Sequence, residues 1–96
     1  MKVLNMRDLS RQQQVDMYGD GPVAYVARPS QFGNPFVIGR DGDRASVIRQ
    51  YEAWLLVQPR LVELARRHLK GMDLVCWCAP LACHADVLLR IANEEV

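Results

Sequence analysis

The stretch from Leu74 to Leu88 constrains this chain most, because it gathers all three cysteines and one of the two histidines at one change of secondary structure. An apolar run that favours a β-strand enters the stretch, and an amphipathic run that favours a helix leaves it. A turn containing Pro80 separates the two runs. Loops that follow a strand and precede a helix are where α/β proteins place ligand and catalytic sites. The sequence therefore predicts an α/β fold with a functional site at this corner.

Two further apolar runs, at residues 2–6 and 23–27, favour short β-strands, as does the run at residues 73–78 that enters the corner. A long helical pattern separates the second run from the third, and strands joined through helices usually pair in parallel. We therefore expect a three- to four-stranded, mostly parallel sheet.

Apolar residues recur at helical spacing over residues 44–70 and again over residues 82–93. Asp43 is a favourable N-cap for the first of these segments, and Pro59 interrupts it. The segment between the first two strands is polar and rich in glutamine, so we expect only a single helical turn there, near residues 9–15. The expected fold is a small α/β domain, Rossmann-like, with helices packed on the sheet.

Residues 1–96 have the length of a single domain, and 50% hydrophobic with 24% charged residues is ordinary for a soluble one. The net charge of +1 does not indicate a nucleic-acid partner. No apolar run reaches the ~18–20 residues of a membrane span, and the first residues lack the apolar segment of a signal peptide. Three clustered cysteines are typical of metal or thiol chemistry in a reducing compartment. We expect a cytoplasmic protein with no membrane partner.

The cysteines and the histidine of the corner are spaced so that they can meet. Residues i and i+2 of a strand point to the same face, so Cys76 and Cys78 project together while Trp77 points the other way. Cys83 and His84 follow the proline turn, at or near the first turn of the last helix. The corner therefore offers three sulfur ligands and one imidazole within nine residues.

This set has the Cys3His composition of a structural zinc site, formed by Cys76, Cys78, Cys83 and His84. The spacing C-x-C-x4-C-H is not one of the usual zinc-binding spacings, and the adjacent Cys83 and His84 would crowd a single ion. We therefore favour a metal-free corner and keep zinc as the possible cofactor. For Cys76 alone we favour a third interpretation, a small buried residue of the core.

Without a metal, the corner has the groups for acid–base or thiol chemistry. A helix N-terminus lowers the pKa of a thiol and offers N–H groups to anions, so Cys83 is expected to be the most reactive thiol. His84 is a candidate acid or base, and Asp86 could orient its imidazole or complement the helix dipole. Cys83, His84 and Asp86 are the candidate catalytic residues, although the sequence specifies no reaction.

A second candidate segment runs from Arg28 to Phe36 and contains two prolines and a glycine, which exclude regular structure. Arg28 ends a predicted strand, where an arginine can hold a carboxylate or phosphate through two hydrogen bonds. Gly33 permits close backbone approach, and Asn34 can orient its own turn. With these three we assign Arg44, Trp77, Cys78 and Pro80 as candidate ligand-binding residues.

Five segments together resemble a small domain family that is common in bacteriophages and bacteria and is classed as a domain of unknown function. The resemblance covers about residues 23–92 and rests on Tyr25–Pro29, Phe32–Phe36, Asp43–Arg44, Cys76–Pro80 and Cys83–Leu88. It implies a phage origin and no established activity. The residues that it places in shared motifs are Arg28, Asn34, Pro35, Arg44, Cys78, Pro80, Cys83, His84 and Asp86.

The chain departs from the family pattern at three positions. Alanine stands at Ala27 and Ala85, where glycine is usual in the family, and phenylalanine stands at Phe32, where tryptophan is usual. These changes conserve size approximately, but they weaken any role of the two glycine positions in close backbone approach.

We therefore expect a small intracellular, phage-encoded protein that binds a nucleotide or another phosphate-bearing metabolite at the Cys–His corner. The alternative is a non-catalytic module that binds a host protein, with the corner serving as a structural or zinc-binding brace. A deep pocket on which Arg28 and His84 converge would favour the first function. An exposed apolar patch rimmed by arginines would favour the second.

Overall fold

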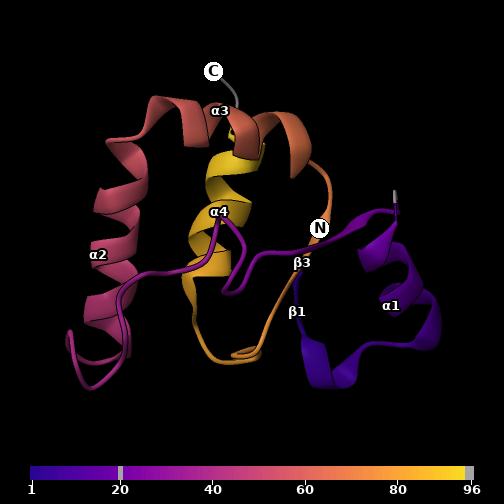
Figure 1. The fold of residues 1–96 in the computed structure, drawn as a ribbon, viewed down its shortest axis with the longest axis horizontal. Helices are drawn as coiled ribbons and strands as arrows, with labels where there is room; N and C mark the ends of the chain where they lie inside the picture. The colour runs from indigo at the N-terminus through magenta and orange to yellow at the C-terminus, as the bar shows by residue number, and fades with distance from the viewer. Residues whose placement is uncertain (20, 95–96) are drawn as a thin grey trace.

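Three short parallel strands form one sheet, with β3 at its centre (Figure 1). The computed structural model describes residues 1–19 and 21–94. β1 spans Val3–Asn5, β2 spans Val23–Tyr25 and β3 spans Asp73–Cys76. Val75 pairs with Leu4 on one side and with Tyr25 on the other. The parallel sheet confirms the predicted α/β class, with three strands in the described part of the chain.

Each strand is shorter than its apolar run, and after β3 the Asn5 side chain takes over the hydrogen bonds. The Asn5 amide donates to the carbonyl oxygens of Trp77, at 3.1 Å, and Ala79, at 2.8 Å. These bonds draw the chain out of β3 directly after Cys76, two residues before the predicted end. β2 ends at Tyr25, although the Val26 N–H still donates to the Val75 carbonyl at 3.0 Å.

Two helices fill the segment predicted to be helical over residues 44–70. α2 spans Arg44–Leu56, and the Asp43 side chain caps it as expected by accepting the Ser46 N–H at 2.8 Å. α3 spans Pro59–His68 and begins on the proline that interrupts the pattern. Proline suits the first helical position because its missing N–H would have no partner there.

The last helix, α4, spans His84–Asn93 and starts two residues later than predicted. Its start is set by a capping box, in which the Cys83 sulfur accepts the Ala85 N–H and the Asp86 carboxylate accepts the Cys83 N–H. Cys83 therefore lies just outside the helix, as its N-cap.

The polar segment after β1 forms more helix than the single turn expected from the sequence. A short 3-10 helix, η1, spans Met6–Asp8, and α1 spans Arg11–Tyr18. The Ser10 hydroxyl accepts the Gln13 N–H while the Gln13 side chain accepts the Ser10 N–H, a second capping box. The predicted helical turn is present but longer, because the Ser10–Gln13 capping box starts a full helix in this polar segment.

The sheet packs on both faces, as the alternation of side chains along β3 requires. Leu74 and Cys76 face the larger core, to which α2, α3 and α4 contribute Tyr51, Leu55, Ala65 and Leu88 among others. Val75 faces a smaller cluster with Leu9 and Val23, next to α1. In Figure 1 the strands accordingly lie between α4 and α1. Among the described residues, no helix has both the length and the apolar character needed to cross a membrane.

Candidate functional site

A pocket of about 400 Å³ opens at the carboxyl edge of the sheet, where β2 and β3 end and where α2 and α4 begin. The loop that follows β2 forms one wall of the pocket. The residues that line it are Ala27, Arg28, Asn34, Phe36, Val37, Ile38, Arg44, Val47, Ile48, Cys76, Trp77, Cys78, Ala82, Cys83 and His84.

Most of the predicted site residues line this one pocket, although they come from four separate segments of the chain. Eight of the candidates line it: Arg28, Asn34, Arg44, Cys76, Trp77, Cys78, Cys83 and His84. Gly33, Pro80 and Asp86 are not among the lining residues. Val37, Ile38, Val47 and Ile48 form an apolar wall of the pocket that was not predicted from the sequence. Val47 and Ile48 belong to the apolar face of α2, and the spacing of apolar residues alone would place that face in the core.

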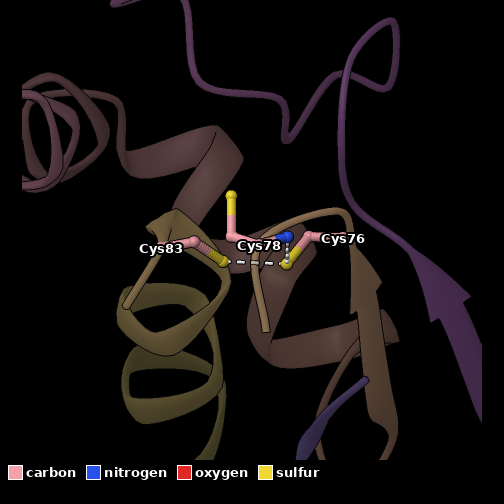
Figure 2. A group of neighbouring side chains, drawn as sticks. All are labelled: Cys76, Cys78 and Cys83. Atoms are coloured by element: carbon pink, nitrogen blue, oxygen red, sulfur yellow. Dashed lines mark hydrogen bonds between the residues drawn. The ribbon is translucent and has the colours of Figure 1, made fainter. Parts of the chain in front are cut away.

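The three cysteines come together at the base of the corner (Figure 2). The sulfur atoms of Cys76 and Cys83 lie 2.9 Å apart and share a hydrogen bond. All three sulfur atoms lie within 4.8 Å of one another, so the cysteines are close enough to hold a metal ion. Cys76 and Cys83 are buried, whereas Cys78 is partly exposed.

The hydrogen bond between Cys76 and Cys83 shifts the pKa values of these two buried thiols in opposite directions. The bond from Cys83, helped by the backbone N–H of Cys78, lowers the pKa of Cys76 to about 6 despite its burial. The pKa of Cys83 is raised, because this thiol shares its proton with Cys76 and is itself buried. From its position at a helix N-terminus, Cys83 is expected to be the most reactive thiol. In the structure Cys83 is only 3% exposed, and the shift that favours a thiolate falls on Cys76.

His84 lies in the pocket wall but turns away from the cysteines. Its Nε2 atom is 2.8 Å from the Val26 carbonyl oxygen, and its ring meets Tyr51 edge-on with centroids 5.0 Å apart. Burial lowers the pKa of His84, so the neutral imidazole is favoured. Among the described residues the metal-ligand cluster holds the three cysteines without His84. The expected Cys3His set is therefore corrected to three cysteines, because the imidazole is engaged at the end of β2.

Asp86 has the role of a helix cap and does not orient the imidazole. Its carboxylate accepts the Cys83 N–H at 2.9 Å. Of the two roles offered by the sequence, the geometry matches the one at the helix N-terminus.

Contacts with the backbone of Arg28 hold this residue at the pocket. Gly33 packs directly on it, since a Cβ atom on Gly33 would lie 3.0 Å from the Arg28 Cα. The Tyr25 hydroxyl donates to the Arg28 carbonyl at 2.8 Å and accepts the Trp77 indole N–H at 3.2 Å. Gly33 therefore provides the close approach expected of it, but toward Arg28.

Arg44 and Asn34 support the part of the pocket wall that α2 forms. The Arg44 guanidinium donates to the Ala82 carbonyl at 3.0 Å, which ties the start of α2 to the corner. The Asn34 amide donates to the Val47 carbonyl at 3.2 Å and accepts the Phe36 N–H at 2.9 Å. Asn34 thus braces the loop against α2, and both ends of its amide are engaged within the protein.

Comparison with known proteins places this chain in a family. Residues 8–94 match the family described as "Domain of unknown function (DUF4326)". The chain is also 30% identical over 73 residues to an uncharacterized 12.4 kDa protein from the nrdA-td intergenic region of Enterobacteria phage T4. That alignment covers 72% of this chain and 66% of the phage protein, just under two thirds of its length. No solved structure matches the chain significantly. Because the family match spans nearly the whole sequence, the chain belongs to the DUF4326 family.

Proposed function

We propose that the pocket at the carboxyl edge of the sheet binds a small phosphate-bearing metabolite, and that the preferred class is a nucleotide. The volume of about 400 Å³ lies in the range of roughly 300–1,000 Å³ typical of small-molecule sites. Its position, outside the carboxyl ends of parallel strands, is where open α/β sheets bind ligands.

The charge of the lining supports an anionic ligand. Arg28 and Arg44 line the pocket, and no carboxylate is among the described lining residues. Within residues 1–19 and 21–94, neither arginine forms an ion pair. Arg28, from the loop after β2, and Arg44, from the start of α2, reach one pocket, and this convergence is the observation that carries the proposal.

The apolar wall supports a ligand larger than a bare phosphate. Phe36, Val47 and Ile48 line the pocket on the side of α2, and Trp77, 52% exposed, lines it from the corner. Aromatic and aliphatic surfaces of this kind accept the flat face of a nucleobase while the arginines hold the phosphate.

The alternative, a module that binds a host protein, has one observation in its favour. Trp77 and Leu81 are both more than half exposed on the corner loop and offer an apolar contact surface. We propose a cytoplasmic, phage-related setting for either function. The free thiols gathered in one corner and the phage relative support that setting.

The direct test is calorimetric titration with the common ribonucleoside monophosphates, the matching nucleosides and inorganic phosphate. We expect the nucleotides to bind more tightly than the nucleosides, because only they engage the arginines. Arg28→Gln and Arg44→Gln should each weaken nucleotide binding about 10- to 100-fold, since a hydrogen bond to a charged group contributes about 1.5–3 kcal/mol.

Arg49→Gln is the matched control, because it removes the same charge from an exposed arginine of α2 that does not line the pocket. It should leave nucleotide affinity within about twofold. Equal losses in all three variants would indicate general charge attraction and would contradict the proposed site. Failure of every phosphate compound to bind the wild-type protein would shift support to the protein-binding alternative.

A further inference from the structure

We propose that Cys76, Cys78 and Cys83 bind one Zn²⁺ ion through their sulfur atoms and leave its fourth coordination position open to the pocket. The three sulfur atoms lie within 4.8 Å of one another, and all three residues line the same cavity. This proposal rests on the thiols alone and does not depend on the nucleotide-binding proposal.

The spacing of the sulfur atoms is within reach of zinc geometry. A Zn–S bond of about 2.3 Å in a tetrahedron places sulfur atoms roughly 3.8 Å apart. The Cys76 and Cys83 sulfur atoms, now 2.9 Å apart, would separate by roughly 1 Å on binding. Cys78 is partly exposed, and its sulfur points away from the other two in Figure 2, so its side chain would turn toward them to complete the set.

The backbone of the corner is held firmly at several points. The Asn5 amide binds the carbonyls of Trp77 and Ala79, and Arg44 binds the carbonyl of Ala82. The Leu81 N–H donates to the Cys78 carbonyl at 2.8 Å and closes the turn. Ligands on a braced loop lose little conformational freedom when the ion binds, which favours affinity.

The corner is also suited to thiolates, the form of cysteine that binds zinc. The Cys76 sulfur accepts the Cys78 N–H at 3.4 Å, and the Cys83 sulfur accepts the Ala85 N–H at 3.3 Å. Arg28 and Arg44 line the same pocket and would offset the net negative charge of three thiolates around one Zn²⁺.

His84 is absent from the ligand set, and this has two consequences. The crowding of one ion by adjacent Cys83 and His84 no longer arises, because the imidazole lies on the Val26 carbonyl. A zinc ion with three protein ligands keeps a position for water or for a donor atom of a bound ligand, as in catalytic rather than structural zinc sites.

The test uses the full chain, purified under reducing conditions and loaded with Zn²⁺ or, anaerobically, with Co²⁺ as a spectroscopic probe. We expect one metal ion per chain by native mass spectrometry. Bound Co²⁺ should show a thiolate-to-cobalt charge-transfer band in the near ultraviolet and the visible bands of a tetrahedral site. Zn²⁺ should displace it. Absence of stoichiometric metal, or bound cobalt without the thiolate band, would overturn the proposal.

Cys78→Ser tests the ligand set with the least disturbance, because Cys78 is the least buried of the three. It should reduce the charge-transfer intensity and weaken cobalt binding by more than the roughly 10- to 100-fold loss typical of removing a partner of a ligand. Circular dichroism checks that the variant is folded. His68→Gln, on an exposed residue of α3, is the control and should leave both readouts unchanged.

Two further measurements test the open position. Added azide or imidazole should shift the visible bands of the cobalt protein, whereas unchanged bands would mean a closed site. His84→Gln should retain the tetrahedral bands, and their loss would identify His84 as a fourth ligand and overturn the open position. Calorimetry with nucleotides on chelator-treated protein keeps failure of this proposal separate from failure of the pocket's proposed function.

Discussion

The imidazole Nε2 of His84 lies 2.8 Å from the carbonyl oxygen of Val26, and this contact joins the start of α4 to the end of β2. The two residues are 58 positions apart in the sequence. The same ring meets Tyr51 of α2 edge-on, at an interplanar angle of 72°. One buried side chain therefore connects three elements that surround the pocket.

Replacing His84 with alanine should destabilise the protein. The change removes a buried ring and leaves the Val26 carbonyl without its partner, which should lower the free energy of unfolding by about 2–4 kcal/mol. Urea denaturation followed by circular dichroism measures the loss. His68→Ala, at an exposed site, should change stability by less than about 0.5 kcal/mol. Similar stabilities for the two variants would contradict a linking role for His84.

Tyr51→Phe should loosen the loop that carries Arg28. The Tyr51 hydroxyl donates to the Phe32 carbonyl at 2.7 Å in a fully buried position, so its removal leaves that carbonyl unsatisfied. We expect a loss of about 1–3 kcal/mol in the free energy of unfolding. Tyr18→Phe, at a residue 80% exposed, is the matched control with an expected change near zero. A stable Tyr51→Phe variant would show that the bond is replaceable, for instance by water.

Gly33→Ala should displace Arg28. The new Cβ would lie 2.9 Å from the Arg28 Cγ and 3.0 Å from its backbone N, and the backbone cannot yield without moving the residue. We expect a loss of about 1–3 kcal/mol in stability and weaker nucleotide binding. Gly19→Ala is the control, since its Cβ would meet only the Val15 carbonyl at an ordinary 3.5 Å. Unchanged thermal stability and affinity in Gly33→Ala would refute the close packing.

Asp41 should titrate below its ordinary range. Hydrogen bonds from Arg40 and from the Val37 N–H hold the pKa of Asp41 below 3.8. Because the folded-state pKa is the lower one, the carboxylate stabilises the turn fully above pH 3.8 and loses that effect as the pH falls through the folded value. An NMR titration of the Asp41 carboxyl carbon gives the midpoint.

Arg40→Gln should raise that midpoint toward 3.8, because it removes the charged donor beside the carboxylate. A wild-type midpoint at or above 3.8 would contradict the assigned contacts. The result bears on the pocket, because Val37 lines it and is held by Asp41.

Local signals in the sequence were sufficient to predict most of the strands and helices in their order and the position of the Cys–His corner. Asp43 caps a helix and Pro59 begins one through interactions within a few residues, so their meaning does not depend on the rest of the fold. The Ser10–Gln13 capping box is equally local, and α1 could have been predicted from it. The position of the cysteines after an apolar strand likewise located the corner.

Only the tertiary structure decided which chemical groups face one another within that corner. The spacing predicts that Cys83 and His84 lie together, but the imidazole turns to the Val26 carbonyl just after β2 and leaves the three sulfur atoms as a group. In the same way, Arg28 faces the pocket because Gly33 and Tyr25 hold its backbone there. A side chain takes the direction in which its polar atoms find partners on burial, and in a parallel sheet those partners come from distant parts of the chain.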